Sequence, residues 1–192
     1  MGKTATEKKA LRQAYRARGA ALTEDYRRRA DRAICAAVLD SDQWKRAESV
    51  FAFVSMWAEP DTRPLLEAAQ REGKRLYLPR CCPDGIMQAV RVYSLDALIP
   101  GAYGIPEPPA DAKTAQPGEL ALALVPCVTV TRDGTRLGHG AGYYDRFLPL
   151  HRCETLSLCY AAMLADALPT DEYDVRMDHV VTEDGVIKCV SA

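Results

Sequence analysis

The chain has 192 residues, of which 48% are hydrophobic and 27% are charged, a composition that suits one soluble globular domain with a sizeable core. The formal net charge of −1 excludes a strong field over the whole molecule. No apolar run reaches the roughly 18–20 residues that a membrane helix needs, and the charged N-terminal stretch lacks the apolar centre of a secretory signal. We therefore predict a cytoplasmic protein that does not associate with a membrane.

The first 40 residues are predicted to form two helices, over residues 4–18 and 24–39, because apolar residues recur there at helical spacing. Thr23 suits the N-cap position of the second helix. Residues 1–32 hold ten Lys and Arg residues against four acidic residues. This excess is either the solvated face of a basic helix or a cationic arm that folds over an anionic ligand.

Short apolar runs alternate with helical patterns through the rest of the chain. Strands are expected over residues 49–54, 75–78, 88–93, 120–125 and 155–159, helices over 62–72, 142–150 and 163–168, and a closing hairpin over 180–182 and 186–189 around Asp184-Gly185. Residues 100–118 are expected to be one long irregular connection, because they include five prolines and three glycines. The alternation predicts a single α/β domain, with a mostly parallel sheet flanked by helices in a Rossmann-like three-layer fold.

Ligands of open α/β sheets bind beyond the carboxyl ends of the strands. Three segments are expected to leave the sheet at such ends, namely residues 54–59, 79–82 and 132–145. The third segment overlaps a Gly-rich loop, Arg136-Leu137-Gly138-His139-Gly140-Ala141-Gly142-Tyr143-Tyr144-Asp145-Arg146. These segments are therefore the candidates for a ligand site.

The Gly-rich loop has glycines at alternate positions, which tolerate positive φ and can point successive backbone N–H groups at an anion. A helix that begins near Gly142 adds the partial positive charge of its N-terminus. Arg136 and Arg146 flank the loop as cations, and Asp145 supplies a carboxylate oxygen of the kind that Mg²⁺ takes. The loop matches neither a Walker A motif nor the dinucleotide fingerprint, and a plain turn is the alternative interpretation.

The sequence of this loop resembles the signature of the 5-formyltetrahydrofolate cyclo-ligase family, whose members are also called 5,10-methenyltetrahydrofolate synthetases. The resemblance covers nearly the whole chain. Further matching segments, in the order of the family, are Lys8-Lys9-Ala10-Leu11-Arg12, Phe53-Val54-Ser55-Met56 with Glu59, Leu78-Pro79-Arg80, Gly104-Ile105-Pro106-Glu107-Pro108 and Tyr173-Asp174-Val175-Arg176-Met177-Asp178.

The resemblance implies cyclisation of 5-formyltetrahydrofolate (folinate) to 5,10-methenyltetrahydrofolate with ATP and Mg²⁺. The formyl oxygen would be phosphorylated, and ADP and phosphate released. Catalytic roles are implied for Arg136, Tyr143 and Asp145, and Mg²⁺ binding for Asp145 and Asp174. ATP binding is implied for Lys8, Arg12, Arg136, Leu137, Gly138, His139, Gly140, Ala141, Gly142, Tyr143 and Tyr144. Folinate binding is implied for Val54, Glu59, His139, Gly140, Ala141, Gly142 and Tyr143. We expect a monomer that binds this small molecule and no nucleic acid.

Several of these residues have simpler interpretations. Lys8 and Arg12 are spaced i and i+4 and can reach one polyphosphate, but without the resemblance they would be two exposed cations. Glu59 either holds the paired N–H donors of a pterin or is a charge at the start of a helix. Tyr144 is equally suited to core packing, and His139 is a candidate phosphate contact.

Ala141 departs from the family pattern, in which glycine or lysine is expected, so no lysine charge is available at this position. His151 and His179 are assigned to local packing or hydrogen bonding. The seven cysteines include no Cys-x-x-Cys motif, which favours free thiols over a disulfide framework or a metal site.

Other classes of function are open at this point. A non-catalytic nucleotide- or folate-binding protein would keep the same fold, and folinate-dependent release of ADP distinguishes it from an enzyme. A nucleic-acid-binding module would use the basic N-terminus, but interleaved aromatic residues and an RNA-recognition motif are missing. Fold analogy alone also allows sugar-phosphate isomerisation or CoA transfer, and a formylated relative of folinate is an alternative substrate.

Overall fold

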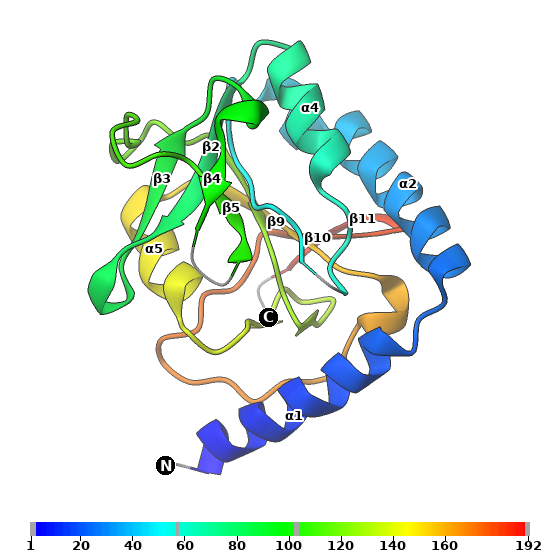
Figure 1. Ribbon diagram of the computed structural model, residues 1–192. Helices are drawn as coiled ribbons and strands as arrows, with labels where there is room; N and C mark the ends of the chain where they lie inside the picture. Colours follow the sequence, from blue (N-terminus) through cyan, green and yellow to red (C-terminus); the bar gives the residue numbers. More distant parts are fainter. Residues whose placement is uncertain (1–2, 57, 102–103, 191–192) are drawn as a thin grey trace.

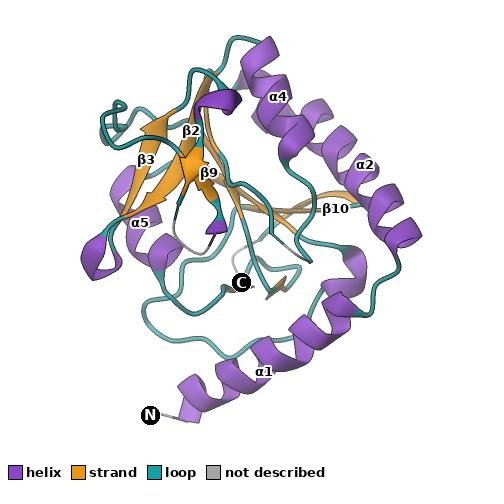
Figure 2. Cartoon of the chain, in the orientation of Figure 1, coloured by secondary structure: helices purple, strands orange, loops and turns teal. Residues whose placement is uncertain are grey.

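The computed structural model describes residues 3–56, 58–101 and 104–190, in which strands and helices alternate (Figures 1 and 2). Seven of the described strands form one sheet in the order β11-β10-β9-β6-β1-β2-β3. They are β1 Ser49–Phe51, β2 Arg75–Cys81, β3 Met87–Arg91, β6 Leu122–Val125, β9 Glu154–Leu158, β10 His179–Thr182 and β11 Gly185–Lys188. Strands β10, β9, β6, β1 and β2 are mutually parallel, whereas the edge strands β3 and β11 are antiparallel. The prediction of a mostly parallel sheet is confirmed.

The order of the parallel strands places a crevice between β1 and β6. Numbered along the chain, these strands follow the order 2-1-3-4-5, one of the doubly wound arrangements. The direction of winding reverses between β1 and β6, which pair directly through Val50 and Leu122. The connections that follow these two strands therefore begin on the two sides of the crevice in which such sheets bind ligands.

Helices cover both faces of the sheet, so the molecule has the three layers that the sequence predicts (Figure 1). The α-helices in the described residues are α1 Lys3–Ala20, α2 Glu24–Asp40, α3 Asp42–Arg46, α4 Arg63–Arg71 and α5 Tyr143–His151. α2 and α4 pack on one face and α5 packs on the other, whereas α1 lies apart, beyond one end of the sheet (Figure 1). None of the described helices is long and apolar enough to cross a lipid bilayer.

Strands β1, β2 and β6 each contribute to both hydrophobic cores, one on each face of the sheet. On β6, Leu122 and Leu124 face α2 and α4, while Ala123 and Val125 face α5. Because both faces are buried, apolar residues follow one another without interruption, as is usual in parallel sheets. This burial explains why the sequence marks β6 so clearly.

Two threonines precede helices but have different roles. The side chain of Thr23 accepts a hydrogen bond from the Tyr26 N–H, so the predicted N-cap of α2 is confirmed. Thr62 precedes α4 but makes no side-chain cap; its hydroxyl donates to the Phe53 carbonyl over 2.6 Å and accepts from the Ser55 N–H. Thr62 therefore ties the two ends of the connection that leaves β1.

Several element boundaries differ from the prediction. β1 ends at Phe51 rather than at residue 54. The helix expected over 163–168 is a 3₁₀ turn, η4 Ala161–Met163, because the chain then extends and the Ala165 N–H donates to Val130. The closing hairpin turns at Glu183-Asp184, since Thr182 already pairs with Gly185.

Smaller elements were missed because they have too few residues to show a period. They are α3, the 3₁₀ turns η1 Pro83–Gly85 and η2 Leu95–Ala97, and the strand pairs β4 Ile99–Pro100 with β5 Pro106–Glu107 and β7 Thr129–Val130 with β8 Arg136–Leu137. The connection 100–118 is therefore partly ordered by pairing, although residues 102–103 lie outside the described part of the chain.

Candidate functional site

A cavity of about 1060 Å³ lies at the carboxyl ends of β1, β2 and β6, where the strand order predicts a crevice. It is lined by every residue for which the sequence suggests a role: Lys8, Arg12, Val54, Glu59, Arg136, Leu137, Gly138, His139, Gly140, Ala141, Gly142, Tyr143, Tyr144, Asp145 and Asp174. These residues come from α1, the connection after β1, the Gly-rich loop and the segment before β10. The fold thus brings together four stretches that are far apart in sequence.

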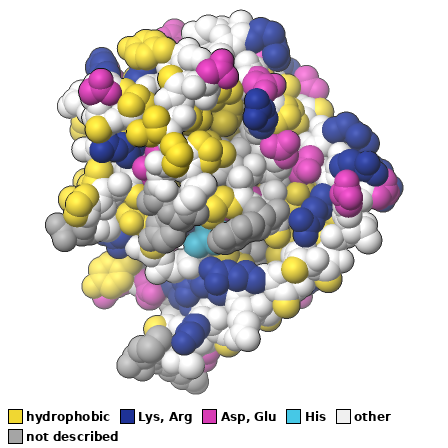
Figure 3. Space-filling view, in the orientation of Figure 1, with side chains coloured by type: hydrophobic (Ala, Val, Ile, Leu, Met, Phe, Trp, Pro, Cys, Tyr) yellow, Lys and Arg dark blue, Asp and Glu magenta, His cyan; other side chains and the backbone are white. Residues whose placement is uncertain are grey.

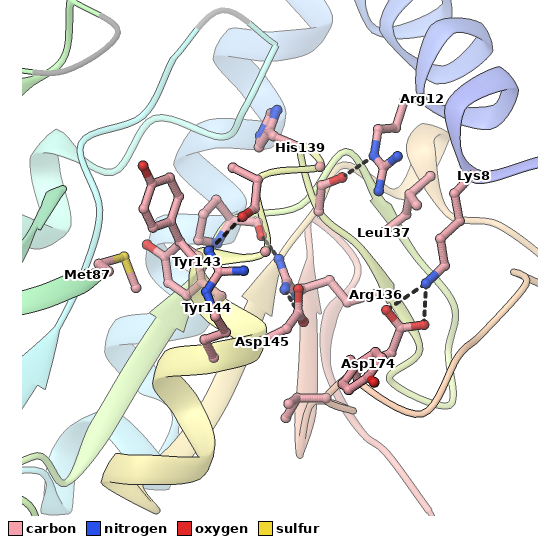
Figure 4. A pocket seen from close by; sticks show the side chains of 18 of the residues that line it. Lys8, Arg12, Met87, Arg136, Leu137, His139, Tyr143, Tyr144, Asp145 and Asp174 are labelled. Atoms are coloured by element: carbon pink, nitrogen blue, oxygen red, sulfur yellow. Dashed lines mark hydrogen bonds and ion pairs between the residues drawn. The ribbon is translucent and has the colours of Figure 1, made fainter. Parts of the chain in front are cut away.

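The cavity has a charged end and an apolar end. α1 contributes Lys8, Lys9, Arg12 and Arg16 at the first, and Lys and Arg side chains gather beside this helix in Figure 3. The other end is lined by apolar side chains, among them Val54, Pro79, Met87 and Ile105. In Figure 4, Lys8 and Met87 lie on opposite sides of the Gly-rich loop, which separates the two ends.

The backbone of the Gly-rich loop has the conformation that its glycines predict. Gly140 has a φ of 108° and Gly142 a φ of 68°, values that residues with a Cβ rarely adopt. Within the described part of the chain, no protein group accepts a hydrogen bond from the N–H groups of residues 138–142. α5 begins directly afterwards with Gly142 as its N-cap and no side-chain cap. The loop therefore offers backbone donors to the cavity at a helix N-terminus, the arrangement that binds anions.

Arg136 is buried beneath the loop. Its side chain is 3% exposed, Nη1 donates to the Pro126 carbonyl over 3.1 Å, and Nη2 donates to Asp145 Oδ1 over 2.7 Å. The guanidinium also lies 5.6 Å from the centroid of the Tyr144 ring. Arg136 does flank the loop, as predicted, but its side chain braces the end of β6 against the start of α5.

Arg146 also bonds to protein oxygens. Its guanidinium donates to the Gly85 carbonyl over 2.7 Å and to the Ala141 carbonyl over 2.8 Å, and it lies 5.7 Å from the Tyr143 ring centroid. These contacts fasten the end of the Gly-rich loop to the turn between β2 and β3. Arg146 therefore flanks the loop, as predicted, and holds it in place.

The cations of α1 reach across the cavity at intervals of one helical turn (Figure 4). Lys8 Nζ lies 2.5 Å from Asp174 Oδ2 and 2.7 Å from Asp171 Oδ2. Arg12 Nε donates to the Gly138 carbonyl over 2.8 Å, and Arg16 Nη2 approaches the His139 carbonyl at 3.5 Å. α1 is thereby linked to both the loop and the segment before β10.

The charges around α1 shift one another's protonation. Burial lowers the pKa of Lys8, but hydrogen bonds to Asp171 and Asp174 outweigh it and leave that pKa raised. The hydrogen bond from Lys8 lowers the pKa of Asp171. Burial and the neighbouring Arg16 lower the pKa of Arg12, whose guanidinium remains charged. Neither Arg16 nor Asp171 was predicted from the sequence, although the four-residue spacing of Lys8 and Arg12, continued by one turn, identifies Arg16.

Glu59 is held on the opposite wall of the cavity. Its side chain is 7% exposed, Oε2 accepts from the Met56 N–H over 2.8 Å, and Oε1 lies 2.8 Å from His139 Nε2. The Tyr160 hydroxyl supports the same connection, at 3.2 Å from the Glu59 carbonyl and 2.8 Å from Asp31 Oδ1. Burial raises the pKa of Tyr160, so this hydroxyl stays protonated. No local pattern marks Tyr160 or Asp31, because both act through tertiary contacts.

The described residues contain no group of three or more His, Cys, Asp or Glu side chains that could hold a metal by itself. Asp145 and Asp174 nevertheless face the cavity, and one oxygen of Asp145 is bonded to Arg136 while Asp174 is bonded to Lys8. Mg²⁺ in nucleotide sites commonly takes one or two carboxylates and completes its shell with phosphate oxygens and water. These two residues fit that mode of binding.

Tyr144 and the two histidines outside the Gly-rich loop make packing or hydrogen-bonding contacts. Tyr144 packs 6.0 Å from Phe51, ring to ring, and its hydroxyl is buried without a partner among the described residues. His151 stacks on Phe147, and His179 Nε2 lies 3.0 Å from Gln43 Nε2, so the prediction of local packing and bonding is confirmed for both histidines. All seven cysteines are free thiols, as predicted.

A family model, related sequences and a solved structure all indicate the same family of proteins. The model of the 5-formyltetrahydrofolate cyclo-ligase family matches residues 4–183. The 5-formyltetrahydrofolate cyclo-ligase of Mycolicibacterium smegmatis is 35% identical over 143 residues, which cover 70% of this chain and 73% of the relative. The mouse 5-formyltetrahydrofolate cyclo-ligase is 29% identical over 192 residues, covering 92% of this chain and 94% of the relative. The NMR structure of Aquifex aeolicus 5,10-methenyltetrahydrofolate synthetase superimposes with a TM-score of 0.86 at 29% identity, covering 96% of this chain and 94% of that chain.

Proposed function

Because the chain belongs to the 5-formyltetrahydrofolate cyclo-ligase family, we propose that its cavity binds folinate and ATP side by side and couples their reaction. Membership of the family makes the chain an enzyme that forms 5,10-methenyltetrahydrofolate. The finer assignment, with ATP consumed and ADP and phosphate released, rests on the geometry of the cavity together with the motifs of the chain.

One observation carries this proposal. The backbone N–H groups of residues 138–142 have no acceptor among the residues that the structure describes, and they lie between an end of the cavity that suits a polyphosphate and an end that suits an aromatic, uncharged ring system. A phosphoryl group that moves between two ligands must pass such a junction. Donors that are fixed there before the reaction stabilise developing negative charge without having to reorganise.

The nucleotide would lie against α1 and the Gly-rich loop. Lys8, Arg12 and Arg16 supply positive charge on one side, and the loop amides together with the N-terminus of α5 supply it on the other. Asp145 and Asp174 would hold Mg²⁺, which when bound neutralises phosphate charge and polarises the transferred group. Lys8 would then share Asp174 with the bound ion.

Folinate would occupy the apolar end. Val54, Glu59 and Tyr143 line the cavity there, and a carboxylate can accept two parallel hydrogen bonds from the ring N–H and amino group of a pterin. Tyr143 offers an aromatic face for the ring system. Because Glu59 is held by Met56 and the support of Tyr160, it would orient the pterin with little rearrangement.

The proposed chemistry needs positioning more than a protein nucleophile. The formyl oxygen attacks the γ-phosphorus, the bond to the bridging oxygen breaks, and ADP leaves. N10 then attacks the activated formyl carbon, the ring closes, the C–O bond breaks, and phosphate departs while N10 releases its proton. Arg136 acts here by positioning Asp145 and Tyr144 rather than by reaching the phosphate itself.

The test is conversion of folinate with Mg-ATP, followed both by methenyl absorbance and by ADP release. Both signals should require both substrates and appear in equal amounts. Glu59→Gln keeps the shape of the side chain but removes the acceptor charge, and we expect its kcat/KM for folinate to fall about 10- to 100-fold. Glu67→Gln is a matched control, because Glu67 lies on the exposed side of α4 and pairs only with Arg63 in the described residues.

Three results would contradict the proposal. If wild-type protein binds both ligands without turnover, the chain is a binding protein that keeps the fold. If ADP forms without folinate at the same rate, the cavity hydrolyses ATP without coupling. If Glu59→Gln has the same kcat/KM for folinate as Glu67→Gln, the Glu59 carboxylate does not bind folinate.

A further inference from the structure

His139 occupies an unusual place in the Gly-rich loop, between Gly138 and Gly140, and its ring reaches across the cavity. Nε2 lies 2.8 Å from Glu59 Oε1, a contact between residues 80 positions apart in the chain. An ionised carboxylate only accepts hydrogen bonds, so Nε2 carries the proton in this pair. The contact therefore presents to Glu59 the same kind of group, a ring N–H, that a pterin would present.

Glu59 has little surface left for a ligand while this contact lasts. Its side chain is 7% exposed, and the Met56 N–H holds Oε2 from the side of the protein backbone. The remaining oxygen faces His139, whose own side chain is 34% exposed. The imidazole thus covers the open side of an otherwise enclosed carboxylate.

We propose that His139 is an internal competitor for Glu59, which folinate must displace in order to bind. This inference rests on the proposed function, because it takes Glu59 as the acceptor for the pterin donors. The Met56 N–H bonds to Oε2 only, so burying Oε1 without a donor would be costly, and His139 removes that cost when no pterin is bound. A ligand gains access only if it replaces the donor that it removes, so the pair also selects against molecules whose edge has no N–H groups.

The surrounding backbone allows this exchange. The glycines on both sides of His139 carry no side chain, so the imidazole can turn about its own side-chain bonds while the backbone of the loop stays in place. The carbonyls of Gly138 and His139 contact Arg12 and Arg16 of α1. These backbone contacts place the pair of His139 and Glu59 next to the side of the cavity where the nucleotide is proposed to lie.

The test measures folinate affinity by calorimetry in four proteins: wild type, His139→Ala, Glu59→Gln and the double variant. Removing the competitor should tighten folinate binding about three- to tenfold, the gain expected if the pair is formed in roughly 70–90% of the molecules. Glu59→Gln should weaken binding. In the Glu59→Gln background, His139→Ala should give no gain, because the group for which His139 competes has lost its charge.

His139→Phe separates competition from ring packing, since it keeps an aromatic ring without an N–H donor. It should tighten folinate binding as His139→Ala does. Thermal unfolding of each variant is measured in parallel, because a merely structural contact would change the melting temperature without changing folinate affinity.

Weaker or unchanged folinate binding in His139→Ala would overturn the inference, and so would a gain that persists in the Glu59→Gln background. These outcomes differ from failure of the proposed function. If wild-type protein neither binds nor converts folinate, both proposals fall, whereas conversion by wild type without tighter binding by His139→Ala removes only the competitor role.

Discussion

Replacing Arg136 by methionine removes a buried cation that three neighbours share. Asp145 loses a hydrogen bond of 2.7 Å, the Pro126 carbonyl loses one of 3.1 Å, and the ring of Tyr144 loses the guanidinium at 5.6 Å. The Arg136 side chain is 3% exposed and that of Asp145 is 23% exposed, so water compensates poorly. The variant leaves both a partly buried carboxylate and a carbonyl without a donor.

The loss can be sized from these contacts. A hydrogen bond to a charged group contributes about 1.5–3 kcal/mol, an unpaired buried acceptor costs about 1–3 kcal/mol, and a cation over an aromatic ring contributes about 0.5–1 kcal/mol. Methionine fills most of the space of the Arg136 side chain. It also removes the buried Arg136 Nε, which has no partner among the described residues, so the total loss is smaller than the sum of these three contributions. We expect the free energy of unfolding to fall by about 2–4 kcal/mol, near the range for breaking a buried pair.

Urea unfolding measures this loss, and a double-mutant cycle with Asp145→Asn assigns it. With a slope of about 2 kcal/mol per M, a loss of 3 kcal/mol shifts the midpoint by about 1.5 M. If the unpaired carboxylate dominates, Arg136→Met should cost less in the Asp145→Asn background, with a coupling energy of about 1–3 kcal/mol. Turnover by the folded variant should fall about 10²- to 10³-fold, because Asp145 and the loop lose their position.

Arg63→Met is the matched control for this experiment. The pair of Arg63 with Glu67 spans one turn of α4, and its side chains are 77% and 49% exposed, so its loss should cost no more than about 0.5 kcal/mol. The reasoning is refuted if Arg136→Met is as stable as this control, or if its coupling to Asp145 is below about 0.5 kcal/mol.

Two further predictions concern α5. Gly142→Ala places a residue with a Cβ at a φ of 68°, and that Cβ would lie 2.7 Å from Arg146 Nη1. Because the Arg146 side chain can move aside, backbone strain should dominate and lower the free energy of unfolding in urea by about 1–2 kcal/mol. Unchanged stability would contradict this prediction and show that the loop relaxes. Burial lowers the pKa of His151 in the folded protein, so as the pH falls the unfolded chain binds a proton at this residue before the folded chain does. The free energy of unfolding should therefore decrease as the pH falls from about 6.5 towards the lowered pKa of folded His151. His151→Phe keeps the stack on Phe147 and should flatten that part of a plot of melting temperature against pH; an identical slope in variant and wild type would contradict the assignment.

The sequence by itself determined the type of fold and the position of the Gly-rich loop that lines the cavity. Apolar runs of strand length, separated by helical patterns, identify a mostly parallel sheet, because burial on both faces leaves a continuous apolar run such as Leu122–Val125. Glycines at alternate positions identify a backbone that can adopt positive φ, as Gly140 and Gly142 do. Both signals depend only on residues that are close together in the sequence, so they can be recognised without knowing the tertiary contacts.

Only the tertiary structure decided which charges remain available to a ligand. Arg136 and Arg146 look alike in the sequence, yet the first is buried on Asp145 and the second is bonded to the Gly85 carbonyl. Lys8 meets Asp174 across 166 positions, and His139 meets Glu59 across 80. Such partners are fixed by strand order and by the path of α1 over the carboxyl edge, and neither periodicity nor turn chemistry encodes a pairing over that separation.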